Sequence, residues 1–560
     1  MAVLAWVAVV VVIAIGGFLP TNDGPCHLFA GWVRANFADP HLRYFDFFWL
    51  HDPPTARGFI DIFIAAFALI PNEETAYFIT VSICVTTWCV GGLLTASALA
   101  SRVSITHLLI VACSLQTSFY MGFFPFILGG GLAFVGLGLW LRLQDRLWLA
   151  TLLAAFCFFL SARCHIFAAG LVGLLLAADA LSRGLRATLA GTVVGLPLCL
   201  VVFQMLDHLR SSKSDVLYTE GWERLTQFPD AFIPGPWWKT WPPLLLVVVG
   251  FAQGRGSARR GVLFVGFLLL IAAVVLPRDF LGWQFAGWRF LPIAAVVGWA
   301  FVRVPASKVG QVVLLAVGVS QLAWSAWFHL DQQEKNAPLL AALKKLTPHP
   351  MFRFPIVRVR PDDIVYGMNP RLHLGQLVTM RTGGTIFYGH HLSAAYHALL
   401  LKDGPVLPDT KDMNPTHFIG QPGDASMSLM MTRAARFDGI TYYGYPDEAD
   451  YLRKIGYDVV FQEGGLIVAD LIGCPLTINM KNVTSPVTVA IGFENGNTPI
   501  NEFTLNPGVE TSYSHTIDRI PCGRRWLIAA GPRQECSKII AEGASLDCTL
   551  KERAPPPAAP

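Results

Sequence analysis

Asp23 and His27 lie four residues apart, directly after the first hydrophobic run of the chain and on either side of a Gly-Pro turn. A carboxylate at a membrane boundary is partly desolvated, which raises its pKa toward the range of a general base. An imidazole one helical turn away could orient a phosphate or take part in proton transfer. We therefore predict that Asp23 and His27 are catalytic. The structural alternative is that Asp23 caps a helix and His27 is an interfacial histidine.

Hydrophobic segments that would position this pair fill the first 330 residues. The chain has 560 residues, 53% hydrophobic and 14% charged, which is too apolar for a soluble enzyme. A crossing helix needs roughly 20 apolar residues. Residues 2–20 lack a basic start and a small-residue cleavage site, so they are predicted to be a retained anchor. We predict about eleven crossing segments by this criterion: 2–20, 75–100, 104–120, 123–141, 147–162, 164–181, 187–206, 242–253, 261–277, 288–302 and 309–328.

Short basic loops set the predicted orientation. They share one side of the membrane if residues 58–71 lie in the interface without crossing. The positive-inside rule then places the N-terminus and these loops in the cytoplasm. The first outer loop, residues 21–74, and everything after residue 330 would face the periplasm of a bacterium, with residues 1–330 in its inner membrane. The basic residues are Arg102, Arg142, Arg146, Arg183, Arg186, Arg255, Arg259, Arg260, Arg303 and Lys308.

Two water-soluble units are predicted after the hydrophobic region. Residues 331–473 mix helical and strand patterns, typical of an α/β domain that could serve as a lid or bind an acceptor. Residues 474–552 show short β-rich runs between Asn- and Gly-rich turns, typical of a small antiparallel β-sandwich. The Pro/Ala tail, 553–560, is predicted to be disordered. In the first unit, helices are expected at 331–346, 389–401 and 447–455, and strands at 355–360, 457–461 and 466–469. In the second, strands are expected at 476–480, 487–493, 502–505, 511–517 and 525–530.

Cysteine usage agrees with this orientation. Seven of the eleven cysteines lie in or beside hydrophobic segments, whereas Cys474, Cys522, Cys536 and Cys548 gather near the C-terminus. An even number in an oxidising compartment predicts two disulfides, with three connectivities open. A zinc site is the alternative, but the spacing lacks the C-x2-C knuckle that structural zinc normally uses.

The segment around Asp23 resembles the GT-C class of membrane glycosyltransferases. The resemblance rests on the D-x-P-x-H-L pattern at 23–28, the long outer loop with its non-crossing helix, the run Tyr120–Gly129 and the membrane-edge Arg289–Pro292. It implies an all-α polytopic domain in which a lipid-linked sugar lies with its phosphate near the outer surface. It also implies that a carboxylate of the first outer loop acts as base on the acceptor or helps to hold a divalent metal.

One feature departs from the class. Many members carry paired acidic residues in this loop, whereas Asp23 has no acidic neighbour in the sequence. Folding would have to bring a second carboxylate, from Asp46, Asp52 or Asp61. A cofactor is therefore not required by the sequence, and Mg²⁺ or Mn²⁺ is the candidate.

Other residues on the outer face are predicted to bind substrate. An arginine fork binds a phosphate or pyrophosphate bidentately, and Arg289 is flanked by Trp288 and Phe290, as a prenyl-phosphate pocket needs. The alternatives are headgroup pairing or snorkelling for the arginines and a buried structural role for His165. The predicted set is Arg57, Tyr120, Arg163, His165, Arg278, Trp288 and Arg289.

These residues lead to one hypothesis and two alternatives. The chain would move a sugar from a polyprenyl-phosphate donor to an extracytoplasmic glycan, lipid or protein acceptor, with inversion. The first alternative is a non-enzymatic transporter or assembly component for envelope polysaccharide, although the spans show no detectable inverted repeat. The second is a polymer ligase that uses the same lipid donor on a different fold. Membrane lipids are expected partners, and no dense basic and aromatic stretch indicates nucleic acid.

Overall fold

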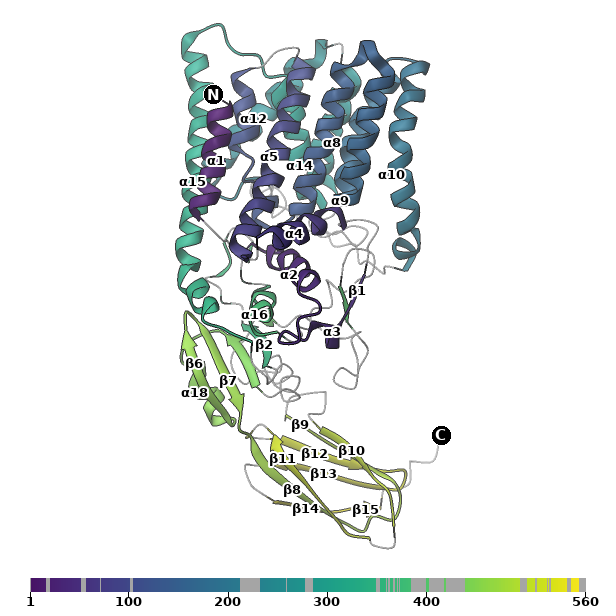
Figure 1. Cartoon of the computed structure of the whole chain (residues 1–560), viewed down its shortest axis with the longest axis vertical. Helices are drawn as coiled ribbons and strands as arrows, with labels where there is room; N and C mark the ends of the chain where they lie inside the picture. The colour runs from purple at the N-terminus through teal and green to yellow at the C-terminus, as the bar shows by residue number, and fades with distance from the viewer. Residues whose placement is uncertain are drawn as a thin grey trace, which may run out of the picture.

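The long helices and most of the strands occupy opposite ends of the molecule in the computed structural model (Figure 1). Long helices of the first 344 residues run roughly side by side, and the C-terminal sheets lie beyond one end of them. The residues that the structure describes are 2–16, 21–51, 57–70, 72–100, 104–211, 232–257, 259–276, 286–348, 353–358, 360, 363–365, 368–369, 371, 373–383, 399–401, 417–418, 439–493, 501–508, 511–520, 522, 525–540 and 545–552.

Five helices in the described part of the chain are long and apolar enough to cross a membrane. They are α5 (Glu73–Ala100), α8 (Phe124–Arg142), α9 (Leu147–Ser182), α10 (Leu185–Ser211) and α15 (Lys308–Lys344). Shorter helices run between them: α1 (Ala2–Gly16), α12 (Trp237–Gln253), α13 (Arg260–Val275) and α14 (Ala286–Ala300). The chain is therefore a mostly helical, multi-pass membrane protein with a C-terminal region rich in strands.

Helix α9 consists of two antiparallel arms joined at His165. As one straight helix, its 36 residues would extend about 54 Å, nearly twice the thickness of a bilayer core. His165 has φ −160° and ψ 103°, which are not helical angles. A Cβ atom at Gly173 would lie 3.6 Å from the ring of Phe158, so the two arms pack against each other. The spans predicted on either side of residue 163 are these two arms.

The basic loops lie together at one end of the helices. Residues beside several helix ends line a single cavity there, among them Ala100 of α5, Arg183 after α9, Arg259 before α13 and Arg303 after α14. The first outer loop lies at the opposite end (Figure 1). The basic loops thus share one side, as predicted, while residues 101–103 lie outside the described residues.

The first outer loop forms a small layer beneath the spans. It contains α2 (Gly24–Ala35), α3 (Tyr44–Phe47), β1 (Phe48–Leu50) and α4 (Arg57–Leu69). Helix α4 lies across the lower ends of the long helices, as expected for a segment that does not cross (Figure 1). Close packing of α2 on α4 depends on Gly31, where a Cβ would lie 2.6 Å from the Cβ of Phe63.

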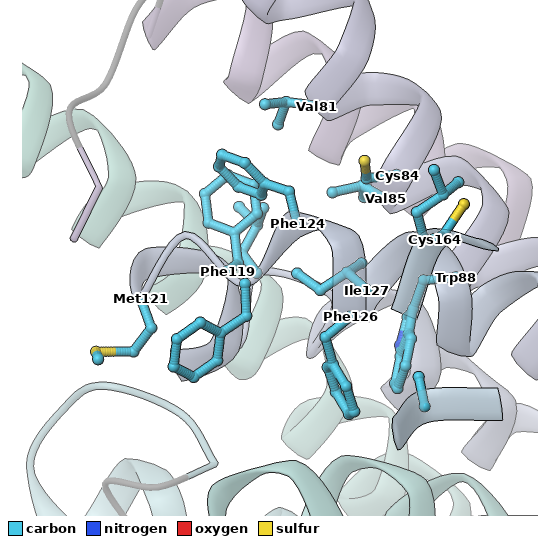
Figure 2. Close-up of a cluster of buried hydrophobic side chains, with 14 of the residues drawn as sticks. Val81, Cys84, Val85, Trp88, Phe119, Met121, Phe124, Phe126, Ile127 and Cys164 are labelled. Atoms are coloured by element: carbon cyan, nitrogen blue, oxygen red, sulfur yellow. The ribbon is translucent and has the colours of Figure 1, made fainter. Parts of the chain in front are cut away.

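The span predicted at 104–120 is a broken helix. It consists of η1 (Ile105–His107), α6 (Leu108–Ala112) and α7 (Thr117–Tyr120). Irregular backbone at membrane depth is tolerated where protein buries it, and every residue of α7 is buried. Figure 2 shows Phe119 and Phe124 beside this break, in one cluster of buried side chains with Val81 of α5. The ring centroids of Phe119 and Phe124 lie 5.6 Å apart, edge to face.

The α/β unit contains a five-stranded sheet of order β4-β2-β5-β7-β6. Strand β2 is parallel to β4 and β5, and β7 is antiparallel to β5 and β6. The predicted boundary at residue 330 falls inside α15, which continues without interruption to Lys344. The elements are β2 (Arg353–Arg358), α16 (Leu374–Thr382), β4 (His417–Phe418), β5 (Gly439–Tyr443), α18 (Glu448–Lys454), β6 (Tyr457–Glu463) and β7 (Leu466–Leu471).

The helix predicted at 389–401 is wrong for the residues of that range that the structure describes. Residues 389–398 lie outside the described residues, but Leu399–Leu401 form strand β3, not a helix. Strand β3 pairs antiparallel with β1 of the first outer loop. Pairing with a distant strand therefore decides the conformation of this apolar tripeptide.

The C-terminal unit is a sandwich of two sheets. One has the order β10-β9-β12-β13-β15 and the other β11-β8-β14. Disulfides join Cys474 to Cys522 and Cys536 to Cys548; the second links β13 to β14 and so connects the sheets. This pairing agrees with the two predicted disulfides. The strands are β8 (Cys474–Lys481), β9 (Val487–Phe493), β10 (Asn501–Leu505), β11 (Tyr513–Ile520), β12 (Arg525–Ala530), β13 (Gln534–Ile540), β14 (Ser545–Thr549) and β15 (Lys551–Glu552).

Candidate functional site

Asp23 is fixed by backbone hydrogen bonds to the turn that follows α7. The backbone N–H of Asn22 donates to the carbonyl of Tyr120, and that of Asp23 to the carbonyl of Met121, both at 2.9 Å. The turn is made by Gly122, whose φ of +74° favours glycine. A Cβ at Gly122 would lie 2.3 Å from the backbone nitrogen of Gly24. The broken span and the first outer loop therefore touch through their backbones.

The side chain of Asp23 does not cap its own helix. Asp23 occupies the N-cap position of α2, but its carboxylate makes no capping hydrogen bond. The hydroxyl of Thr21 instead accepts from the backbone N–H of Gly24 at 3.1 Å. Oδ1 of Asp23 accepts from the side-chain amide of Asn22 at 2.9 Å and lies 3.3 Å from Nε2 of His373. The helix-capping alternative for Asp23 is therefore wrong.

His373 comes from the soluble region, directly before α16, and is only 1% exposed. The same region contacts the first outer loop at other points. The backbone N–H of Asn369 donates to Oδ1 of Asn22 at 3.3 Å, and the hydroxyl of Tyr44 donates to the carbonyl of Thr379 at 3.1 Å. The soluble region thus completes the surroundings of Asp23.

These partners determine the protonation state of Asp23. Burial by itself raises the pKa of the Asp23 carboxyl. The hydrogen bond and charge of His373, with smaller contributions from His27 and Asn22, outweigh burial and hold the pKa below its usual value. The expectation of a raised pKa is therefore wrong, because these partners outweigh desolvation. The carboxylate is ionised at neutral pH, and 24% of its side chain is exposed, so a second molecule can reach it.

His27 lies one turn along α2 and faces α4, with its ring 5.3 Å from that of Phe59. Burial lowers the pKa of His27 to about 4, and the nearby charge of Asp23 offsets this only in part. The imidazole is therefore neutral at pH 7. A neutral imidazole can accept or donate a hydrogen bond but supplies no positive charge to a phosphate.

Two more predicted residues join this neighbourhood. His165, at the tip of α9, lies close enough to both His27 and Arg289 to interact with them electrostatically. Arg289 is 6% exposed, and its guanidinium lies 4.3 Å from the ring centre of Phe123, next to the turn that holds Asp23. The structure thus gathers Asp23, His27, His165 and Arg289 at one end of the helices.

The remaining residues predicted to bind substrate are Arg57, Tyr120, Arg163, Arg278 and Trp288. Arg163 lies at the same tip of α9, where its Cβ would be 3.5 Å from a Cβ at Gly58 of α4. The ring of Tyr120 packs against Phe328 of α15, at 4.9 Å between ring centres, and the carbonyl of Tyr120 accepts from the backbone N–H of Asn22, the residue before Asp23. Trp288 is half-buried in the apolar core. Arg278 and the side chain of Arg57 lie outside the described residues.

A divalent metal is not matched by the residues around Asp23. Asp46 is ion-paired with Arg43 at 2.7 Å, Asp61 is exposed on α4, and Asp52 lies outside the described residues. Within the described part of the chain, no three His, Cys, Asp or Glu side chains are grouped as metal ligands. One carboxylate with two histidines is also an unusual set for Mg²⁺, which prefers oxygen ligands.

Sequence reasoning missed Asn22, Gly122 and His373. Asn22 adjoins Asp23, and Gly122 lies within the run Tyr120–Gly129, so both stood inside recognised segments. The sequence has no comparable signal for His373, which follows Asp23 by 350 positions. Together the site offers an ionised carboxylate open to a nucleophile, next to a buried guanidinium and the imidazoles of His27, His165 and His373.

The chain is similar in fold to three solved glycosyltransferases. The oligosaccharyltransferase of Archaeoglobus fulgidus, in its apo form, gives a TM-score of 0.43 at 10% identity and covers 98% of this chain and 99% of its own. ArnT of Cupriavidus metallidurans in the apo state gives 0.47 at 11% identity, over 83% and 97%. The same ArnT bound to undecaprenyl phosphate gives 0.45 at 12% identity, with the same coverage.

The mycobacterial arabinofuranosyltransferase AftD gives 0.44 at 13% identity, over 85% of this chain and 40% of its own. No protein-family model matches the sequence, and no curated protein is similar to it. The similar structures are glycosyltransferases, as in the resemblance drawn from the sequence. At these TM-scores the likeness carries no argument about activity, which depends on the site itself.

Proposed function

We propose that this chain is a membrane glycosyltransferase in which Asp23 is the catalytic base. The observation that carries the proposal is the position of the Asp23 carboxylate. This carboxylate is ionised and makes no capping hydrogen bond to α2. It is partly exposed where the ends of the membrane helices meet the soluble region. A structural aspartate in this position would be expected to cap α2, which the Asp23 carboxylate does not do.

The proposed donor is a sugar linked to a polyprenyl phosphate, and the acceptor is an extracytoplasmic glycan, lipid or protein. Asp23 takes the proton from the acceptor hydroxyl or amine as that atom forms a bond to the anomeric carbon. The bond between the anomeric carbon and the phosphate oxygen breaks, and the phosphate keeps the electron pair. Attack from the opposite face inverts the anomeric configuration. Asp23 then releases its proton to solvent.

Arg289 and His165 would hold the leaving phosphate. Arg289 supplies a charge that does not depend on pH, and its stacking on Phe123 fixes the guanidinium plane. Charge develops on the phosphate oxygen as the sugar departs, so a preorganised guanidinium stabilises the transition state more than the ground state. His27, which is neutral, would orient the acceptor.

The proposed orientation has eleven crossing segments in a bacterial inner membrane, with the basic loops in the cytoplasm and the soluble region in the periplasm. The test is single-cysteine labelling with an impermeant thiol reagent in intact spheroplasts. Among the described free cysteines Cys199 alone is exposed, so Cys199→Ser is the background. Thr484→Cys should be labelled and Ala306→Cys should be protected, since both side chains are exposed on opposite ends. The reverse pattern would overturn the orientation.

The test of mechanism is Asp23→Asn, assayed as transfer of labelled sugar at matched protein level. Asparagine keeps the size of the side chain and can still accept from His373, so folding and donor binding should persist. Loss of a general base typically lowers the rate by about 10²–10⁴. Full activity of Asp23→Asn would remove Asp23 from the mechanism and favour the transport or assembly alternative.

Two further variants separate the other roles. Arg289→Lys keeps the charge but replaces the bidentate fork by a point charge, so it should raise KM for the donor. His27→Ala should raise KM for the acceptor while leaving donor binding unchanged. If Arg289→Lys changes neither donor KM nor kcat, Arg289 does not bind the donor phosphate.

A further inference from the structure

A cavity of about 600 Å³ opens among the basic loops, at the opposite end of the helices from Asp23. The broken span connects the two ends: Ser104, just before η1, lines the cavity, whereas Gly122 touches the Asp23 segment. The proposed transfer reaction takes place at the Gly122 end and assigns no role to this cavity.

Three arginines from three different loops line the cavity. Arg183 follows α9, Arg259 precedes α13 and Arg303 follows α14. Glutamine side chains lie between them: Oε1 of Gln253 accepts from the backbone N–H of Arg303 at 2.6 Å. Three guanidinium groups at one concave surface create a strongly positive potential, and each presents several N–H donors.

One buried carboxylate compensates part of this charge. Asp179, which is 1% exposed, pairs with Arg259 at 2.8 Å and with Arg183 at 3.4 Å. Trp140 donates to its Oδ2 at 2.9 Å. Arg303 has no carboxylate partner among the described residues; its guanidinium donates to the backbone carbonyl of Gln253 at 3.4 Å. Three positive charges thus face one negative charge, which leaves the lining with a net positive charge.

Part of the cavity wall is apolar. Leu99, Ala300, Phe301 and Val302 line it next to the arginines. An inorganic anion alone would gain nothing from this surface, whereas an amphiphile would place its phosphate on the arginines and its alkyl part on the apolar wall. Both features therefore favour an anionic amphiphile over a small ion.

We propose that this cavity binds a phosphate-bearing anion, with the phosphate held by Arg303, Arg183 and Arg259. The same chemistry could come from an anionic lipid headgroup of the adjacent leaflet or from a soluble phosphate ester. Asp179 keeps two of the arginines in place, and Arg303 supplies the uncompensated charge. The site is independent of the proposed transfer reaction.

The test uses the full-length protein in nanodiscs and measures its thermal unfolding. One arm compares discs of phosphatidylcholine with discs that also contain phosphatidylglycerol. The other titrates glycerol 3-phosphate into phosphatidylcholine discs. A ligand that binds the folded state raises Tm, and the rise grows with the logarithm of one plus the ratio of the free ligand concentration to Kd. A rise in the first arm alone identifies a lipid headgroup, and a rise in the second identifies a soluble phosphate ester.

The decisive variant is Arg303→Gln, because it leaves the Asp179 ion pairs intact. Loss of one charge-assisted hydrogen bond should weaken apparent affinity by about tenfold, and Arg303→Lys should recover part of it. The matched control is Arg146→Gln, which removes an exposed arginine of the same end that does not line the cavity. Equal loss in Arg146→Gln, or no Tm rise with either ligand, would overturn the proposal.

Discussion

Two aspartates, one at each end of the membrane helices, have opposite surroundings. Asp179 is 1% exposed and pairs with two arginines, so its charge is compensated and its lone pairs are occupied. The Asp23 side chain is 24% exposed and is held by an amide and an imidazole. A carboxylate whose lone pairs are occupied by two guanidinium groups has little room for another hydrogen-bond donor, whereas the Asp23 carboxylate keeps part of its surface open to a second molecule. The comparison separates a stabilising carboxylate from a reactive one.

Replacing Gly122 by alanine should have the largest effect on stability and transfer activity taken together, because it displaces Asp23 without changing any charge. The φ of +74° and the predicted clash with Gly24 together should cost about 2–4 kcal/mol of stability. Transfer activity should fall in the folded fraction as well. Gly195→Ala is the control, since a Cβ there meets nothing within 4 Å. Denaturation and specific activity of both variants check this.

Asp179→Asn should show most directly that the two aspartates have different roles. It removes the charge that balances Arg183 and Arg259, and we expect a loss of about 1–3 kcal/mol in the free energy of unfolding. The specific activity of the folded fraction should match that of the wild type, in contrast to Asp23→Asn. A loss of activity as large as that of Asp23→Asn would contradict the assignment of Asp179 as a stabilising carboxylate.

The pH profile of His373→Phe should show the smallest effect, a displacement of the acid limb. Asp23 must be deprotonated to act as base, so activity falls as pH drops through its pKa. His373 holds that pKa below its usual value against the opposing effect of burial. Without His373, burial is less opposed, the pKa rises, and the acid limb of kcat/KM should move to higher pH. An unchanged limb would show that His373 does not act on Asp23.

Local patterns sufficed for much of the fold. Strands at 487–493 and 525–530 have the predicted bounds, because turn residues and alternating side chains mark both ends. Helix α16 and strand β5 were not predicted, because their residues are buried on all sides and show no polar alternation to reveal a period. The kink at His165 was predicted as a gap between two spans, because a mostly apolar segment of 36 residues is too long for one crossing.

Half of the site could be found from the sequence in the same way. Asp23 and His27 stand out because ionisable residues next to an apolar run are uncommon. The pKa of Asp23 could not be predicted, because its direction depends on His373, which only the tertiary structure brings near. The hydrogen bond from Asn22 to the carbonyl of Tyr120 could not be predicted either, since a backbone carbonyl leaves no signature in residue type.

Helix α15 runs unbroken for 37 residues, about 55 Å, from the basic end into the soluble region. Its length therefore fixes how far the soluble region lies from the membrane helices. It also fixes the rotation of the soluble region about the helix axis. One residue added within it would rotate everything beyond by about 100° and raise it by about 1.5 Å. The distance from His373 to Asp23 thus depends on the length of a helix that contains neither residue, which makes α15 intolerant of insertions and deletions.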